Sequence, residues 1–242
     1  MNLVIDQGNS KTKIAIFDNN DQKEIFEADF IEKEIITSIL QKYEIENCIF
    51  GTVKNVEDTI LNFLKDKFKH FILLNSSTPL PVKLGYKTPS TLGMDRVAAV
   101  VGANAETPDC PVIVIDAGTA ITYDFITKDG VFEGGNIAPG MKMRLKSLNE
   151  YTDKLPLVDA KGETPIVGYN TETAIRSGVV NGICYEIEGF ISQIKAIHPS
   201  VLVFLTGGDA FFLSEKLKCL FFVDKNLVLK GLNRILNYNV ER

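Results

Sequence analysis

A segment near the start of the chain recurs about half a chain length later. Residues 3–16, LVIDQGNSKTKIAI, align with residues 113–126, IVIDAGTAITYDFI, at an offset of 110 residues in a chain of 242, and six of the fourteen aligned positions are identical. Each copy has an apolar run, an Asp-x-Gly turn and a second β-rich run, which predicts a β-hairpin with a carboxylate at the tip of its first strand. Because the offset is close to half of the chain, we favour a duplicated unit over chance similarity between two hairpins.

Helical and strand-like patterns alternate along the rest of the chain. In the first half, the predicted helices cover residues 31–43, 56–68 and 94–104, and the predicted strands cover residues 48–52 and 71–74. Residues 75–92 are rich in Pro, Ser and Thr and predict an irregular loop. In the second half, the predicted strands cover residues 112–116, 121–127, 131–134 and 201–205, and the predicted helices cover residues 171–197, 211–218 and 226–237.

This alternation predicts an α/β fold. The pattern β-β-β-α-β-α occurs twice, which indicates two similar domains with mixed sheets, at residues 1–110 and 111–242. No linker separates the two predicted domains, and we therefore expect them to pack tightly around a cleft.

The longest predicted helix, residues 171–197, carries apolar side chains on more than one face. These are Ile175, Val179, Val180, Ile183, Ile187 and Ile191. One face must cover the sheet of its own domain, and we expect the surplus to pack against the same helix of a second subunit in a two-fold interface. The alternative is a helix buried wholly within its own domain. If the helix breaks, Gly182 is the expected position.

The composition excludes several classes of protein. Hydrophobic residues make up 45% and charged residues 24%, which is typical of a globular protein, and the net charge of −5 argues against a nucleic-acid partner. No apolar run has the length of a membrane span, and the first six residues lack the basic region of a signal peptide. The four scattered cysteines indicate reduced thiols in a cytoplasmic protein, and two histidines without clustered cysteines argue against a zinc site.

The turn of the first hairpin is rich in groups that bind phosphate. Gly8 lets the backbone approach a ligand closely, and Asp6 is placed to hold a hydrated Mg²⁺. Further donors are the side chains of Ser10, Lys11, Thr12 and Lys13. A plain turn would use Gly and Asn as well, but the second copy at residues 116–120 supports a nucleotide held between two such turns. P-loop and Rossmann signatures are missing, which disfavours those folds.

Three further segments carry candidate chemistry. Asp95 and Arg96 begin a predicted helix, where an acidic residue complements the helix dipole or, in a cleft enzyme, serves as a general base beside an arginine clamp. Residues 206–210 form either a simple strand-to-helix turn with Asp209 as N-cap or a contact surface for adenine and ribose. Residues 134–140 contain three glycines and a proline, which shape either a pocket or a turn.

Taken together, these motifs resemble the type III pantothenate kinases of the acetate and sugar kinase/Hsp70/actin superfamily. The resemblance runs from residue 6 to residue 209 and includes the G-x-D-R motif at residues 93–96 with Tyr86 seven positions before it. The two phosphate turns alone are shared by the whole superfamily, and it is the ordered set of motifs that is specific. It implies two similar ribonuclease H-like domains with mixed sheets flanking a nucleotide cleft. The implied reaction is ATP-dependent phosphorylation of pantothenate to 4′-phosphopantothenate, the first step of coenzyme A synthesis.

The resemblance also implies residue roles. Asp95 is the expected catalytic base, and Asp116 is expected to bind a monovalent cation such as K⁺ or NH₄⁺, with Mg²⁺ at Asp6. The expected ATP contacts are Asp6, Gln7, Gly8, Asn9, Ser10, Lys11, Thr12, Lys13 and Thr119. The expected pantothenate contacts are Tyr86, Gly93, Met94, Asp95, Arg96 and Thr171. The family works as a homodimer with sites near the subunit interface, and no membrane or nucleic-acid partner is expected.

Three alternatives remain open at the level of the sequence. A sugar or other small-alcohol kinase of the same superfamily would share the phosphate turns but would lack Tyr86 and the G-x-D-R motif at this spacing. A non-enzymatic homologue could serve as an accessory factor for transcription, although an intact Asp95 disfavours that role. An actin- or Hsp70-like ATP switch needs extra subdomains, for which 242 residues leave little room.

Overall fold

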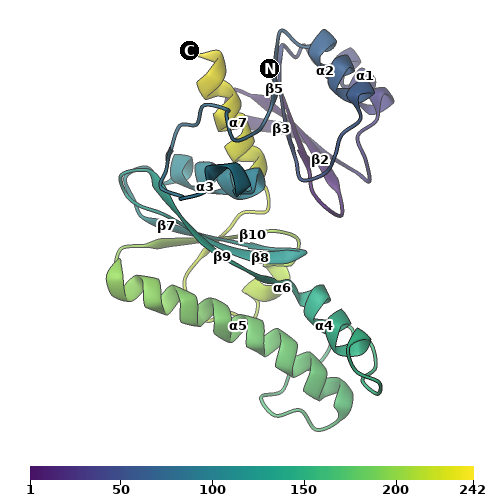
Figure 1. Ribbon diagram of the computed structural model, residues 1–242, viewed down its shortest axis with the longest axis vertical. Helices are drawn as coiled ribbons and strands as arrows, with labels where there is room; N and C mark the ends of the chain where they lie inside the picture. Colours follow the sequence, from purple (N-terminus) through teal and green to yellow (C-terminus); the bar gives the residue numbers. More distant parts are fainter. The chain divides into compact units, whose positions relative to one another are not determined.

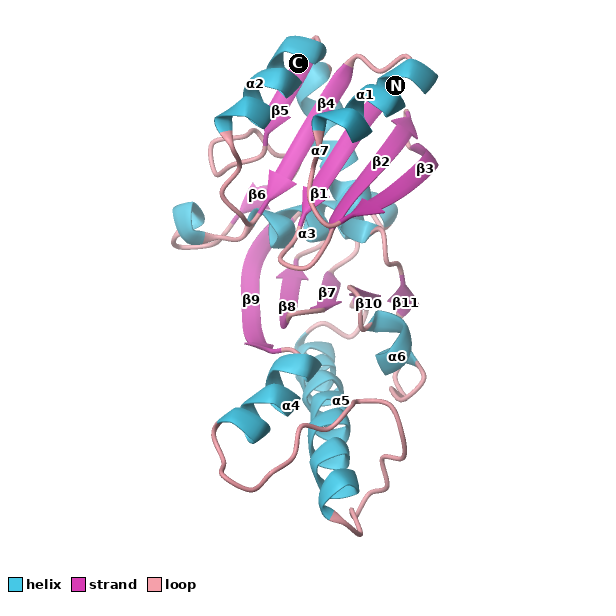
Figure 2. Ribbon diagram, turned by 90° about the vertical axis from the view of Figure 1, so that its right-hand side faces the viewer, coloured by secondary structure: helices cyan, strands magenta, loops and turns pink.

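The computed structural model describes residues 1–242, which form two compact units built around two β-sheets (Figures 1 and 2). The first unit contains Met1–Asp109, Ile126–Gly134 and Asn226–Arg242, and the second contains Cys110–Phe125 and Gly135–Lys225. The two units are therefore not continuous in sequence, unlike the expected domains 1–110 and 111–242. Residues 126–134 and 226–242 belong to the first unit.

The sheet of the first unit has five strands in the order β3-β2-β1-β4-β5. They are β1 (Asn2–Gln7), β2 (Thr12–Asp18), β3 (Asp21–Ala28), β4 (Asn47–Thr52) and β5 (His70–Leu73). β1 pairs antiparallel with β2 and parallel with β4, so the predicted first hairpin is confirmed. Side chains along a strand alternate between faces, and both faces of β1 are covered, since Leu3, Val4 and Ile5 are completely buried.

Helices cover both faces of this sheet. On one face, α1 (Lys33–Lys42) and α2 (Asp58–Lys67) pack on the same cluster as Leu3 and Ile5. On the other face, α3 (Met94–Glu106) and α7 (Leu227–Val240) pack against each other and against β4. Hydrophobic periodicity predicted all four helices correctly to within a few residues.

The contact between α3 and α7 is made by backbone at two glycines. A Cβ atom on Gly231 would lie 2.6 Å from the carbonyl carbon of Ala98 and 2.9 Å from the amide nitrogen of Gly102. Gly102 in turn approaches the carbonyl of Leu227 too closely for any side chain. This close crossing is the physical reason that residues 226–242 belong to the first unit rather than to the second half of the chain.

A chain of asparagine side chains also fastens α7 to the sheet. Nδ2 of Asn2 donates hydrogen bonds to Oδ1 of Asn233 at 2.8 Å and to Oδ1 of Asn237 at 2.6 Å. Oδ1 of Asn2 accepts a hydrogen bond from Nδ2 of Asn47 at 2.9 Å. Buried amides are stable only when such partners are present, so this network specifies where α7 docks.

The second sheet repeats the strand order of the first. Its order is β11-β10-β7-β8-β9-β6, in which β7, β8, β9, β10 and β11 take the places of β1, β2, β3, β4 and β5. The strands are β7 (Val112–Ala117), β8 (Ala120–Ile126), β9 (Val131–Pro139), β10 (Leu202–Thr206), β11 (Phe222–Val223) and β6 (Lys83–Leu84). The sequence repeat therefore corresponds to equivalent strands, as expected for a duplicated unit.

The long helix α5 (Thr171–Ile197) is continuous through Gly182 and covers the second sheet. All six apolar side chains that were expected to supply a surplus for a second subunit are buried within this unit, at 7% exposure or less. That part of the expectation is wrong, because α4 (Met141–Glu150) and the segment before α5 cover the remaining apolar positions. None of the helices combines the length and apolar composition that a membrane crossing requires.

Three local expectations also need correction. The segment 75–92 is not wholly irregular, since it contains the short strand β6 and a 3₁₀ turn at Pro89–Thr91. The helix expected at 211–218 is only α6 (Ala210–Ser214). The segment 134–140 is no turn, because β9 continues to Pro139. Each error involves a short or glycine-rich element whose structure depends on its neighbours more than on its own propensity.

The helix crossing yields a stability prediction. Replacing Gly231 by Ala should lower the free energy of unfolding by about 1–3 kcal/mol, because the new methyl group must push α7 away from α3. Gly182→Ala is the matched control, since a Cβ there meets nothing within 4 Å, and the change should be neutral or stabilising by up to about 1 kcal/mol. Urea unfolding followed by circular dichroism measures both, and equal stability of the two variants would contradict the packing described here.

Candidate functional site

Asp6 lies near the end of β1 on the face of the sheet that α3 covers. It is opposite Lys13 in the β1–β2 register. Burial raises the pKa of Asp6 from its usual 3.8 to about 6, the Lys13 ammonium group opposes this shift, and the carboxylate of Asp95 adds to it. The structure thus brings together, within one unit, the carboxylate expected to hold Mg²⁺ and the one expected to act as the base.

Asp95 is held at the N-terminus of α3 by the local backbone. Its Oδ1 accepts a hydrogen bond from the backbone N–H of Arg96 at 2.9 Å. A Cβ on Gly93, the N-cap residue, would lie 2.6 Å from the same oxygen, so glycine is required for the carboxylate to fold back over the helix start. Asp95 remains exposed to solvent.

Tyr86 and Arg96 lie side by side in the same unit. The guanidinium carbon of Arg96 is 6.0 Å from the centre of the Tyr86 ring, a cation–π arrangement, and the Arg96 side chain is buried. One edge of the ring, at Cδ2 and Cε2, lies against Gly134. Sequence reasoning singled out Tyr86, Gly93, Met94, Asp95 and Arg96, and all five belong to the first unit.

The phosphate turn between β1 and β2 is tight. The N–H of Gly8 donates to the carbonyl of Lys11 at 3.0 Å, which leaves Asn9 and Ser10 exposed at the tip. The Lys11 ammonium group forms an exposed ion pair with Asp29 at 2.6 Å. A phosphate would compete with this carboxylate for Lys11, and surface pairs of this kind are weak enough to exchange.

Gln7 and Thr12 point to the other face of the sheet, away from Asp6. The Gln7 side chain is buried, and its Oε1 accepts a hydrogen bond from the Thr52 hydroxyl at 2.9 Å. The Thr12 hydroxyl is completely buried and has no hydrogen-bond partner. Strand alternation already separates these positions from Asp6, so the two side chains lie on the face of the sheet opposite the Asp6 carboxylate.

Asp116 occupies the corresponding place at the end of β7 in the second unit. Gly207, with φ of +94°, lies directly against the Asp116 carboxylate and the Ala117 carbonyl, where no side chain fits. The N–H of Asp209 donates to the Ala117 carbonyl at 2.9 Å, and the N–H of Gly140 donates to the Thr119 carbonyl at 3.1 Å. The turns at residues 117–119 and 207–209 therefore lie beside this carboxylate, and sequence reasoning did not predict its contact with Gly207.

Asp209 is the N-cap residue of α6, but its side chain makes no capping hydrogen bond. Burial raises the pKa of the Asp209 carboxyl, and the Lys142 ammonium group opposes the shift. Gly208 has no neighbour within 4 Å of a Cβ position, so the space beside it is open. The simple capping interpretation of this turn is therefore not what the geometry supports.

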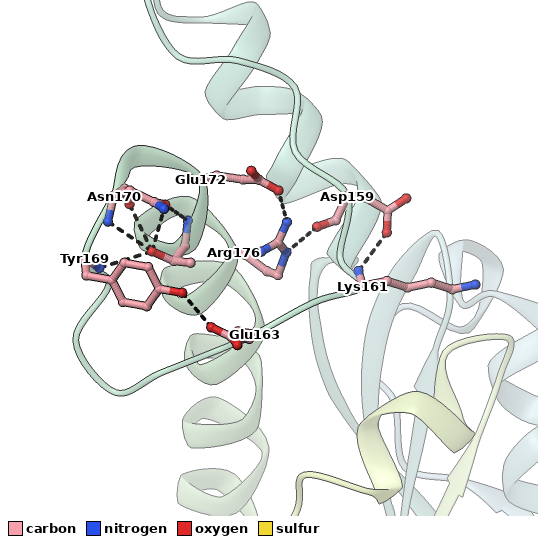
Figure 3. A network of polar contacts seen from close by, with 8 residues as sticks. Asp159, Lys161, Glu163, Tyr169, Asn170, Glu172 and Arg176 are labelled. Atoms are coloured by element: carbon pink, nitrogen blue, oxygen red, sulfur yellow. Dashed lines mark hydrogen bonds and ion pairs between the residues drawn. The ribbon is translucent and has the colours of Figure 1, made fainter.

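Thr171 is the first residue of α5 and is exposed, at the end of the helix that lies far from the sheet (Figures 1 and 2). No contact brings it to the turns around Asp116. Figure 3 shows how this end is fastened: Oδ1 of Asn170 accepts from the N–H of Thr173 at 2.8 Å, and Nε of Arg176 donates to the carbonyl of Asp159 at 2.8 Å. A second guanidinium nitrogen of Arg176 pairs with Glu172.

The residues present fit a hydrated divalent cation better than a protein-only metal cage. No three His, Cys, Asp or Glu side chains come together as a metal site. Mg²⁺ is usually held by one or two carboxylates together with water and substrate phosphates. Asp6, a carboxyl at the end of a strand whose pKa is raised by burial, is suited to this role because a cation would favour its charged form.

The chain matches known proteins over most of its length. Residues 2–193 match the family model described as type III pantothenate kinase. The type III pantothenate kinase of Phocaeicola vulgatus is 51% identical over 239 residues, which cover 99% of both chains.

Solved structures share the fold at lower identity. A Campylobacter jejuni protein described as a Baf family transcriptional activator has a TM-score of 0.64 at 23% identity, over 99% of this chain and 100% of its own. A hexokinase of the ROK group from Thermus thermophilus has a TM-score of 0.54 at 12% identity, over 98% and 99%. These likenesses confirm the predicted α/β fold class with ribonuclease H-like units and mixed sheets. The match over most of its length and the 51% identity place this chain in the type III pantothenate kinase family.

Proposed function

We propose that this chain transfers the γ-phosphoryl group of ATP to the primary hydroxyl of pantothenate, giving 4′-phosphopantothenate in the first step of coenzyme A synthesis. The observation that carries the proposal is the electrostatic proximity of Asp6, Lys13 and Asp95 in a chain of this family. Because the reaction consumes ATP, we propose that it takes place in the cytoplasm.

Phosphoryl transfer to an alcohol requires positioning, charge neutralisation and a proton acceptor. In the proposal, Asp95 accepts the proton of the attacking hydroxyl with the oxygen that does not bond to the Arg96 N–H. The backbone of residues 8–11 and the ammonium group of Lys13 receive the phosphates. Mg²⁺, when held at Asp6, supplies positive charge that lowers the repulsion between phosphates and carboxylates.

The substrate side of the proposal uses Tyr86 and Arg96. A planar guanidinium group suits the carboxylate of pantothenate because it offers two parallel donors. Arg96 is already stacked on Tyr86 and directly follows the base in the chain, so a substrate held by these two side chains would bind beside Asp95. We also propose a substrate contact at Thr171 and ATP contacts at Thr119 and at the open turn of Gly208.

The base gives the most direct mutational test. Asp95→Asn keeps the shape and the hydrogen bond to the helix start but removes the proton acceptor, so kcat should fall by roughly 10²–10⁴-fold. Nucleotide binding, measured by titration calorimetry, should remain close to that of the wild type. Asp66→Asn, on the exposed face of α2, is the matched control and should leave kcat unchanged. Wild-type turnover by Asp95→Asn would remove Asp95 from the mechanism.

The raised pKa of Asp6 predicts a pH-dependent stability. The folded-state pKa of Asp6 is about 6, against an ordinary 3.8, so the folded chain holds this proton more tightly than the unfolded chain does. The stabilisation of the folded state by this proton is therefore fully present below pH 4 and is lost as the pH rises to 6. Above pH 6, Asp6→Asn should therefore be more stable than the wild type, with a free energy of unfolding higher by at most about 3 kcal/mol. The difference, measured by urea unfolding, should vanish near pH 4. Both proteins are measured without nucleotide and with EDTA, and a difference that does not change between pH 4 and 7 would refute the burial effect.

We further propose a monovalent cation, K⁺ or NH₄⁺, at Asp116. The support is a carboxylate at the end of an apolar strand with the carbonyl of Ala117 close by, a mixed oxygen environment that suits such a cation. Turnover should rise strongly when K⁺ replaces Na⁺ at constant ionic strength, and Asp116→Asn should blunt that response. Equal rates in K⁺, Na⁺ and a bulky organic cation would rule the site out.

We also propose that the chain forms a homodimer. The proposed interface residues differ from the apolar residues of α5 that were first expected to form it. Tyr185 is 61% exposed on α5, and Ile166 and Val167 are 88% and 79% exposed just before the helix. Exposed apolar side chains at this density are typical of interfaces. Light scattering at micromolar concentration should give twice the mass of the chain, and Ile166→Ser with Val167→Ser should reduce it. A fully active monomer would contradict this assembly.

A further inference from the structure

The ring of Tyr86 lies directly against the backbone of Gly134. Gly134 has φ of +120°, and a Cβ atom there would lie 2.9 Å from Cδ2 and 3.0 Å from Cε2 of Tyr86. Such distances are shorter than side chains tolerate, so the ring occupies the space that any other residue would fill. The contact joins residues 48 positions apart within the first unit.

The pairing of β6 with β9 brings the two residues together. Lys83 and Leu84 pair in parallel with Val131 and Phe132. The N–H of Lys83 donates to the carbonyl of Gly130 at 2.9 Å, and the N–H of Gly85 donates to the carbonyl of Phe132 at 2.9 Å. Continued by two residues, this register places Tyr86 beside Gly134. The ladder therefore fixes the backbone, and the missing side chain at Gly134 fixes where the ring lies.

Arg96 also lies next to the ring. Its guanidinium carbon is 6.0 Å from the ring centre, and its side chain is only 6% exposed. Arg96 directly follows Asp95 at the start of α3, so the position of the ring is tied to the position of the candidate base. A ring displaced from Gly134 would have to move relative to Arg96.

We propose that Gly134 is a positioning residue that acts through Tyr86 to shape the binding site for pantothenate. The inference rests on the proposed function and deepens it, since Gly134 need not touch the substrate. A small side chain at this position pushes the ring out of place and weakens the binding of the alcohol substrate, whereas the ATP contacts on the β1–β2 turn lie on a separate element and are unaffected.

Gly130 provides a control on the same hairpin. It also has a positive φ, +70°, but a Cβ there meets nothing within 4 Å. Substitution of Gly130 by Ala therefore introduces backbone strain without displacing a neighbour. Gly85 provides a milder displacement, because its Cβ would lie 3.1 Å from Cγ1 of Val131 and would loosen the β6 pairing next to Tyr86.

The test compares KM for pantothenate, KM for ATP and kcat in six proteins: wild type, Gly134→Ala, Gly130→Ala, Gly85→Ala, Tyr86→Ala and the double variant of Gly134 and Tyr86. Gly134→Ala should raise KM for pantothenate by about 10- to 100-fold, with KM for ATP within about twofold of wild type. Gly130→Ala should leave KM for pantothenate and KM for ATP unchanged. Gly85→Ala should shift KM for pantothenate in the same direction by less, which keeps the test decisive if Gly134→Ala folds poorly.

The double variant separates positioning from strain. With the ring removed, adding Gly134→Ala should change KM for pantothenate by less than about twofold, because no side chain remains to be displaced. The inference is overturned if the effect of Gly134→Ala persists without the ring, if Gly130→Ala reproduces it, or if Tyr86→Ala binds pantothenate normally. Failure of the proposed function looks different, since the wild type would then release no ADP in response to pantothenate.

Discussion

The electrostatic interaction between Asp6 and Asp95 links the chemistry of the first unit to its fold. Asp6 is carried to the edge of the core by a fully buried strand, and Asp95 is carried there by α3. The place of α3 depends in turn on α7, which crosses it through backbone contact at Gly231. Two carboxylates near each other repel, and the Lys13 ammonium group opposes the resulting rise in the pKa of Asp6.

The two copies of the hairpin share their strand order but have diverged at the strand ends. In the first copy, Asp6 lies opposite Lys13 across the hairpin. In the second, Asp116 lies against Gly207 and a backbone carbonyl instead. A lysine suits the phosphates of a nucleotide, and carbonyl oxygens suit a bound cation. The two hairpins thus share one scaffold, and the groups that lie beside their two carboxylates differ.

Periodicity in the sequence predicted the elements that bury continuous apolar faces, including both hairpins and α5. It failed for β6, which has two residues and exists only because β9 is beside it. It also failed for α4, because most residues of this helix are polar and only two, Met141 and Leu145, are buried, which is too few for an apolar pattern. The motifs predicted Asp6 and Asp95 as a pair of site residues, but the contact between Tyr86 and Gly134 depends on strand register between distant segments, which no local pattern contains.

The central claim is that this chain phosphorylates pantothenate at the site organised by Asp6 and Asp95. The most direct measurement is ADP release by the purified protein with ATP, Mg²⁺ and K⁺, in the presence of pantothenate or of a panel of sugars and short hydroxy acids, with the phosphorylated product identified by mass spectrometry. The account predicts rapid ADP release with pantothenate alone, matched by an equal amount of 4′-phosphopantothenate, and loss of both with Asp95→Asn. Preferential turnover of a sugar, or no pantothenate-dependent ADP release at all, would contradict it.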